Sequence, residues 1–219
     1  MPISDRLRIG ALRGAPVLLA FSLLAGCDET TANAFAAGGS APRARVLTSA
    51  KIDGGKITVL GPAGFCVDAR SLRPTGARQF ALLAQCDLMT GGEVSGVNSL
   101  SLLTVTAVRS SDTALPTPDQ IAAPYAPAQV LNSARIDGVQ LVQLSQGGER
   151  ATKSADPVHW RGVMTLAGHT IGLAAYSTQN GAARGAEGRD LLLALARNMR
   201  RATTGTGTGD TPAVQAPTE

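Results

Sequence analysis

Apolar and polar residues alternate with a period of two along much of the chain from residue 46 onward, a pattern typical of half-buried β-strands. The segment Val46 to Leu60 predicts a hairpin, because Asp53-Gly54 is a favoured turn dipeptide between two such runs. Further strands are expected in segments rich in Val, Leu, Phe and Thr, at residues 65–67, 79–86 and 99–108.

The C-terminal part of the chain predicts a hairpin followed by a helix. Residues 158–166 and 170–176 are apolar-rich runs on either side of an Ala167-Gly168 turn. Residues 187–201 have a helical period, with an apolar face made of Leu191, Leu192, Leu195 and Met199. We therefore expect Leu191, Leu195 and Met199 to be buried against the sheet.

The segment before this hairpin is rich in proline, at positions 116, 118, 124 and 127, which excludes a long helix and leaves room for one short helical turn. Residues 49–54 and 133–138 resemble each other, since Ser-Ala-Lys-Ile-Asp-Gly matches Ser-Ala-Arg-Ile-Asp-Gly. Two hairpins that share an Asp-Gly turn explain this similarity as well as an internal duplication does.

Together these elements predict an α+β fold, in which an antiparallel sheet is covered by a C-terminal helix, over residues 46–202. The hairpin-then-helix ending is distantly similar to PsbP-like domains of exported proteins. That similarity rests on the pattern of elements alone and supplies no site residue.

The N-terminus has the three parts of a secretory signal peptide over residues 1–26. Arg6, Arg8 and Arg13 precede an apolar run from Ala15 to Ala25 that is far shorter than the roughly 20 residues of a bilayer-spanning helix. The run ends in Leu24-Ala25-Gly26-Cys27, which resembles the lipobox of bacterial lipoproteins. The alternative is an ordinary secreted protein with a cysteine at the cleavage point.

The resemblance implies that Cys27 becomes the mature N-terminus and carries a lipid, such as palmitate, that holds the protein on a membrane of the cell envelope, facing the periplasm. Asp28 resembles the inner-membrane retention signal of enterobacterial lipoproteins, which favours the inner membrane over the outer one. Residues 27–45 and 203–219 are poor in large apolar side chains, so we expect a flexible tether and a disordered tail. The mature chain resembles uncharacterised envelope lipoproteins of high-GC bacteria, a resemblance that implies no activity.

The cysteine count agrees with lipidation of Cys27, because the remaining two cysteines can form one pair. In an oxidising periplasm Cys66 and Cys86 are expected to form a disulfide. The alternatives are two buried free thiols or a redox pair, and the latter lacks Cys-x-x-Cys spacing.

Composition argues against nucleic acid as a partner. Removal of residues 1–26 lowers the formal net charge from +4 by three arginines and one aspartate, to +2, and the chain has only one Trp, two Tyr and four Phe. Nucleic-acid binding would call for a concentrated basic patch with stacking aromatic side chains.

Candidate catalytic chemistry is sparse, so we expect no enzymatic activity and no cofactor or metal. The two histidines, His159 and His169, fall near opposite ends of the predicted hairpin, about 23 Å apart, too far to share a metal. Hydrolase signatures such as Gly-x-Ser-x-Gly and His-Glu-x-x-His do not occur. Asp68 and Arg70 can form an ion pair at a strand end, or a polar site beside the cysteine pair.

A basic cluster at the end of the predicted helix, Arg197, Arg200 and Arg201, suits the negative end of the helix dipole. It is also a candidate surface contact for anionic lipid or another acidic surface. The sequence thus predicts a non-enzymatic lipoprotein that binds a protein or cell-wall partner. A small-ligand carrier or sensor is the alternative, and it requires a concave pocket among the strands.

Overall fold

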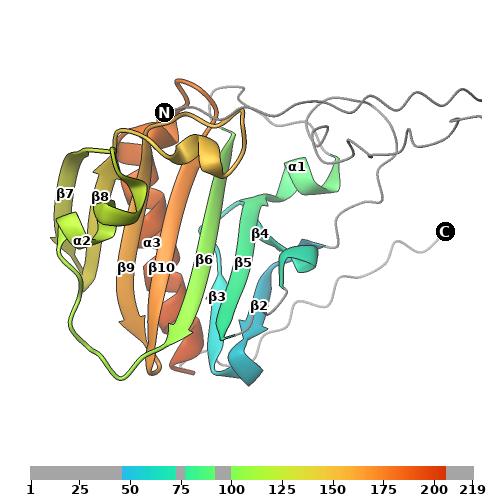
Figure 1. Cartoon of the computed structure of the whole chain (residues 1–219). Coiled ribbons are helices and arrows are strands. Elements are labelled where there is room, and N and C mark those ends of the chain that lie inside the picture. The colour runs from blue at the N-terminus through green and yellow to red at the C-terminus, as the bar shows by residue number, and fades with distance from the viewer. Residues whose placement is uncertain (1–45, 73–76, 92–99, 206–219) are drawn as a thin grey trace, which may run out of the picture. The chain divides into compact units, whose positions relative to one another are not determined.

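A computed structural model describes residues 46–72, 77–91 and 100–205 of this chain. The predicted signal peptide, the lipid site at Cys27, the tether and the tail beyond residue 205 lie outside the described residues. The predicted α+β fold is confirmed, with a large antiparallel sheet and a long C-terminal helix (Figure 1).

Eight strands form one antiparallel sheet, in the order β1-β4-β5-β6-β10-β9-β8-β7. In that order the strands are Val46–Leu47, Phe65–Asp68, Arg78–Gln85, Ser101–Arg109, His169–Ser177, His159–Leu166, Val139–Leu144 and Val130–Ile136. Two more strands, β2 (Ser49–Ile52) and β3 (Ile57–Leu60), form a separate hairpin. The predicted strands therefore exist, and β9 and β10 turn at Ala167-Gly168 as expected.

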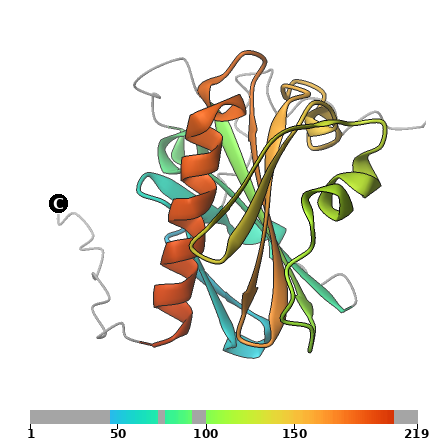
Figure 2. The same ribbon diagram turned by 90° about the vertical axis from the view of Figure 1, so that its left-hand side faces the viewer.

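The C-terminal helix α3 (Ala186–Thr203) packs on one face of the sheet, beside the β2–β3 hairpin (Figure 2). Leu195 and Met199 are fully buried there, as predicted. Leu191 is only half-buried. Leu192 occupies the centre of the buried helix face, and Leu191 is turned about 100° away from it around the helix axis. A single apolar core joins this helix, the hairpin and the facing side of the sheet.

The other face of the sheet has a small cover of its own, which the sequence pattern did not predict. Helix α2 (Pro118–Ala122) and the 3-10 helix η3 (Ala123–Tyr125) lie over strands β7 and β8 (Figure 2). Ile121 and Ala122 pack there against Val142 and Leu144. Thr117 and Gln120 form a capping box at the start of α2, and this explains the short helix in a proline-rich segment.

The two similar segments, 49–54 and 133–138, both form the first strand and turn of a hairpin. Asp53 and Asp137 each adopt a φ of +48°, in the left-handed region that Asp tolerates better than most residues. The loops differ, since β7 and β8 are joined by Asp137-Gly138 alone, whereas β2 and β3 are joined by four residues, 53–56. Shared turn chemistry accounts for the similarity.

Cys66 and Cys86 form a disulfide, as predicted, with their α-carbons 4.9 Å apart. Cys66 lies on β4, and Cys86 begins the short helix α1 (Cys86–Thr90) directly after β5. The backbone N–H of Cys86 donates to the carbonyl oxygen of Gly64 at 2.9 Å, so the pairing of β4 with β5 continues to the bridge. The disulfide therefore fastens the β4–β5 ladder to α1.

Candidate functional site

One side of the sheet is left without a helix over strands β5, β6 and β10, within the described residues (Figure 1). Strand alternation and register bring a mixed row of apolar and hydroxyl side chains to this side, mostly half-buried. We call it the open face, and it consists of Arg78, Phe80, Leu82, Leu102, Thr104, Thr106, Val108, Thr170, Gly172 and Ala174. Val108 is 38% exposed, among the most exposed large apolar side chains of the described residues.

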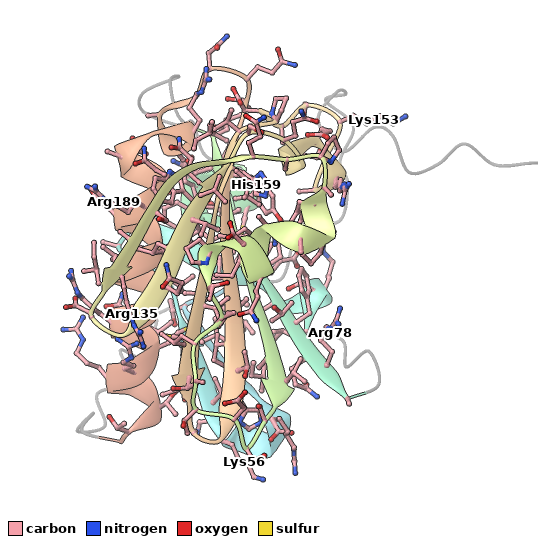
Figure 3. All side chains as sticks on the ribbon, turned by 60° about the vertical axis from the view of Figure 1, so that its left-hand side comes forward. Lys56, Arg78, Arg135, Lys153, His159 and Arg189 are labelled. Carbon is pink, nitrogen blue, oxygen red and sulfur yellow. A yellow bond between two sulfur atoms is a disulfide. The ribbon has the colours of Figure 1, made fainter. Side chains whose placement is uncertain are left out.

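Four side chains gather at one end of the open face, and we call them the His159 cluster: Tyr125, His159, Arg161 and Tyr176. The rings of His159 and Tyr176 stack with centroids 5.4 Å apart, and Tyr125 meets His159 edge-on at 5.6 Å. Figure 3 shows His159 against the sheet, whereas Lys56 and Lys153 point outward from the molecule. The cluster joins β9, β10 and η3 at a single place.

His159 is neutral and has one unused acceptor. Its Nδ1 lies 3.1 Å from the carbonyl oxygen of Pro157, which can only accept, so Nδ1 carries the ring proton and donates. Nε2 is then an unprotonated acceptor, and it is buried without a hydrogen-bond partner among the described residues. Burial, together with the nearby cation of Arg161, lowers the pKa of His159 to about 4, so the ring stays neutral at physiological pH.

Arg161 places a positive charge close to both tyrosine rings. Its guanidinium carbon lies 4.5 Å from the centroid of Tyr125 and 5.2 Å from that of Tyr176, within the range of cation–π attraction. Its Nε is buried without a hydrogen-bond partner, and no ion pair within the described residues engages its charge. The cluster therefore holds both an unpartnered donor and an unpartnered acceptor.

Tight backbone packing fixes the position of His159. The buried carboxylate of Asp156 accepts from the backbone N–H groups of Val158 at 2.9 Å and Asn180 at 2.8 Å, which ties the start of β9 to the chain beyond β10. Gly147 has a φ of +104°, and a Cβ there would lie 3.1 Å from the Tyr125 ring and 3.3 Å from that of His159. A side chain at Gly147 would therefore disturb the cluster.

His169 has a different environment from His159. Its Nε2 lies 3.0 Å from a carboxylate oxygen of Asp53, and Arg109 donates to the other oxygen at 3.0 Å. The hydrogen bond from Arg109 lowers the pKa of Asp53, with a smaller contribution from His169. His169 pairs with Leu166, seven residues from His159, and it lies on the α3 side of the sheet. The two histidines are therefore apart, as predicted, and the Asp53 contact fastens the β2–β3 turn to the sheet.

Most of the predicted arginine cluster on α3 is engaged in contacts within the protein. Arg197 is exposed and forms an ion pair with Asp137 at 2.6 Å, while Arg200 donates to the carbonyl oxygens of Asp137 and Gly138. Arg201 is exposed and donates to Asn198 on its own helix. Two of the three arginines thus fasten α3 to the β7–β8 turn.

Asp68 and Arg70 form the predicted ion pair, with two hydrogen bonds of 3.1 Å. Asp68 is also the N-cap of the 3-10 helix η2 (Ala69–Ser71), because its carboxylate accepts from the backbone N–H of Arg70 at 2.9 Å. These contacts give the pair a local structural role at the end of β4.

In the described part of the chain, no group of three or more His, Cys, Asp or Glu side chains is placed to hold a metal ion. None of the helices in that part combines the length and apolar composition needed to cross a bilayer.

Comparison with family models, curated proteins and solved structures finds no match for this chain.

Sequence reasoning singled out His159 but not its three partners. His159 and Arg161 share one face of β9, opposite Trp160 and Met164, and this alternation was visible. A strand face that carries His and Arg is usually solvated, however, and nothing in the sequence indicates that Tyr125 folds over it.

Proposed function

We propose that this chain is a non-enzymatic binding lipoprotein of the bacterial cell envelope. A lipid on Cys27 tethers it to the membrane, facing the periplasm, and the domain binds a partner through the open face. The lipobox-like Leu24-Ala25-Gly26-Cys27 supports the tether.

The open face is the observation that supports the binding role. Three neighbouring strands present half-exposed apolar and threonine side chains there, while the opposite side of the same strands is buried in the main core. Contiguous exposed apolar surface on a soluble domain commonly marks an interaction site.

A second candidate is a carrier or sensor of a small ligand, the alternative that the sequence leaves open. The two buried and unpartnered atoms of the His159 cluster, Nε2 of His159 and Nε of Arg161, favour it. Buried polar groups are normally hydrogen-bonded, so a small polar ligand between them would satisfy both.

Site-specific photo-crosslinking in intact cells tests the binding role. A photoreactive residue at Val108 probes the open face, and one at Arg201 probes the exposed end of α3. We expect a discrete crosslinked product from position 108 and none from position 201. A product from position 201 alone would assign binding to the arginine cluster and overturn the proposal.

A further inference from the structure

We propose that the His159 cluster binds a carboxylate group, with Arg161 as the principal contact. This inference rests on the proposed binding function and names the chemistry that the open face recognises at its cluster end. The carboxylate belongs to the partner, as an acidic side chain or as a chain terminus.

The first support is an unbalanced charge. Arg161 carries the only formal charge among the four side chains of the cluster, and no ion pair within the described residues neutralises it. Arg150, on the 3-10 helix η4 (Gly148–Arg150), adds a second cation 5.7 Å from the Tyr125 ring. Glu149 acts on His159 with its negative charge, and its carboxylate accepts from the backbone N–H of Gly147 at 3.0 Å, so this one anion stands against the two cations Arg161 and Arg150. The cluster therefore has positive charge to offer to an anion.

The second support is the pair of unused atoms. The Nε–H of Arg161 is a donor without an acceptor, and Nε2 of His159 is an acceptor without a donor. Arg161 is only half-buried, so solvent reaches part of this side chain. A carboxylate that accepts from Nε–H also brings negative charge close to the His159 ring.

That negative charge favours the protonated form of His159, because it opposes the burial and the Arg161 cation that keep the ring neutral. Nε2 then takes up one proton from the buffer and donates it in a hydrogen bond to the second carboxylate oxygen. Binding thus adds one carboxylate and one proton to the site, and the overall charge stays the same. Tyr176 contributes no charge change, since burial raises its pKa further above neutrality.

The shape of the contact favours a carboxylate over a phosphate. The guanidinium carbon of Arg161 lies 4.5 and 5.2 Å from the centroids of the two tyrosine rings, so these rings occupy part of the space around it and limit the directions from which an anion can approach. Arginine matches a planar carboxylate through two parallel N–H donors. A phosphate dianion would call for several cations or backbone N–H groups around it.

The chain has only two histidines, so ¹⁵N-histidine NMR of the lipidated mature protein in detergent micelles resolves the site. Acetate is the probe, and His169 is the internal control because it contacts Asp53 instead. At pH 6 we expect acetate to move the His159 Nε2 resonance toward the protonated position and to leave His169 unchanged. The apparent affinity should rise up to tenfold for each pH unit between 7.5 and 5.5, as uptake of one proton requires.

Arg161→Gln should weaken the acetate response at least tenfold, while Arg135→Gln, an exposed arginine on β7, should leave it unchanged. An unchanged His169 signal confirms that a variant is folded. If Arg161→Gln does not fold, Arg161→Lys, which keeps the charge but loses the planar edge, should still weaken the response. N-acetylalanine and N-acetylglutamate amide then distinguish a chain terminus from an acidic side chain.

A His159 resonance that ignores acetate, or that responds to inorganic phosphate and not to acetate, would overturn the carboxylate proposal. A crosslink from position 108 together with a His159 resonance that acetate does not shift would support the binding function and contradict only the carboxylate proposal. A response that is equal in wild type and Arg161→Gln would also contradict the proposed role of Arg161.

Discussion

The imidazole of His159 stacks on the ring of Tyr176 with an interplanar angle of 12°, and its Nε2 has no hydrogen-bond partner in the part of the chain that the structure describes. This relationship leaves an uncharged, unsatisfied histidine near Arg161, whose positive charge helps to lower the pKa of the histidine. A buried polar atom without a hydrogen bond lowers the stability of the folded domain. Proteins tolerate such local losses of stability at binding sites.

The domain should lose stability as the pH falls from 7 to 5. His159 has a folded-state pKa of about 4, below its ordinary value of 6.5, so the unfolded chain binds the proton first. Stability is therefore full above pH 6.5 and falls as the pH is lowered toward 4. We expect urea denaturation to give a free energy of unfolding about 2 kcal/mol lower at pH 5 than at pH 7. His159→Phe should remove most of that difference, and an unchanged difference in this variant would show that another group is responsible.

Reduction of the Cys66–Cys86 disulfide should destabilise the domain without altering its fold. The bridge closes a loop with a sequence separation of 20, worth about 3 kcal/mol on the chain-entropy model. Denaturation with and without reductant measures the difference. The double variant Cys66→Ala/Cys86→Ala should unfold at the same midpoint under both conditions. Wild-type stability that is insensitive to reductant would contradict this expectation.

Leu195→Ala should cost about 2 to 5 kcal/mol, because Leu195 is fully buried between α3 and the sheet. Leu191→Ala is the matched control on the same helix, since Leu191 is only half-buried and should cost clearly less. Chemical denaturation of the two variants measures both costs. Equal costs would mean that Leu191 contributes as much as the core position, contrary to its place at the helix margin.

The strands and α3 could be predicted from sequence because their periods are strong and their turns carry clear signals, such as Asp137-Gly138. The covering role of α2 could not, since a single helical turn with Ile121 and Ala122 has too few apolar residues to show which surface it covers. The separation of the β2–β3 hairpin from the main sheet also escaped sequence reasoning, because alternation defines strands but not their partners.

The candidate site was predicted only in part, for the same reason. His159 was visible as one of two histidines, and Arg161 shares its strand face, but Tyr125 and Tyr176 come from other segments of the chain. Only the antiparallel register and the fold of η3 bring them together. Local pattern carries no information on such long-range contacts.

Cys27→Ser should release the protein from the membrane fraction, since the lipid on Cys27 is the proposed anchor. Cell fractionation followed by immunoblotting measures the distribution. Membrane retention with normal processing would contradict the lipoprotein proposal.

The central claim, that the open face and Arg161 together bind a partner, is tested most directly by the yield of the photo-crosslink from position 108 in two arginine backgrounds. Arg161→Gln should reduce the yield about tenfold or more, as loss of a charge-assisted contact worth about 1.5 kcal/mol or more requires. Arg135→Gln, which changes the same charge on the exposed strand β7, should leave the yield at the wild-type level. Equal yields in the two variants would contradict the claim.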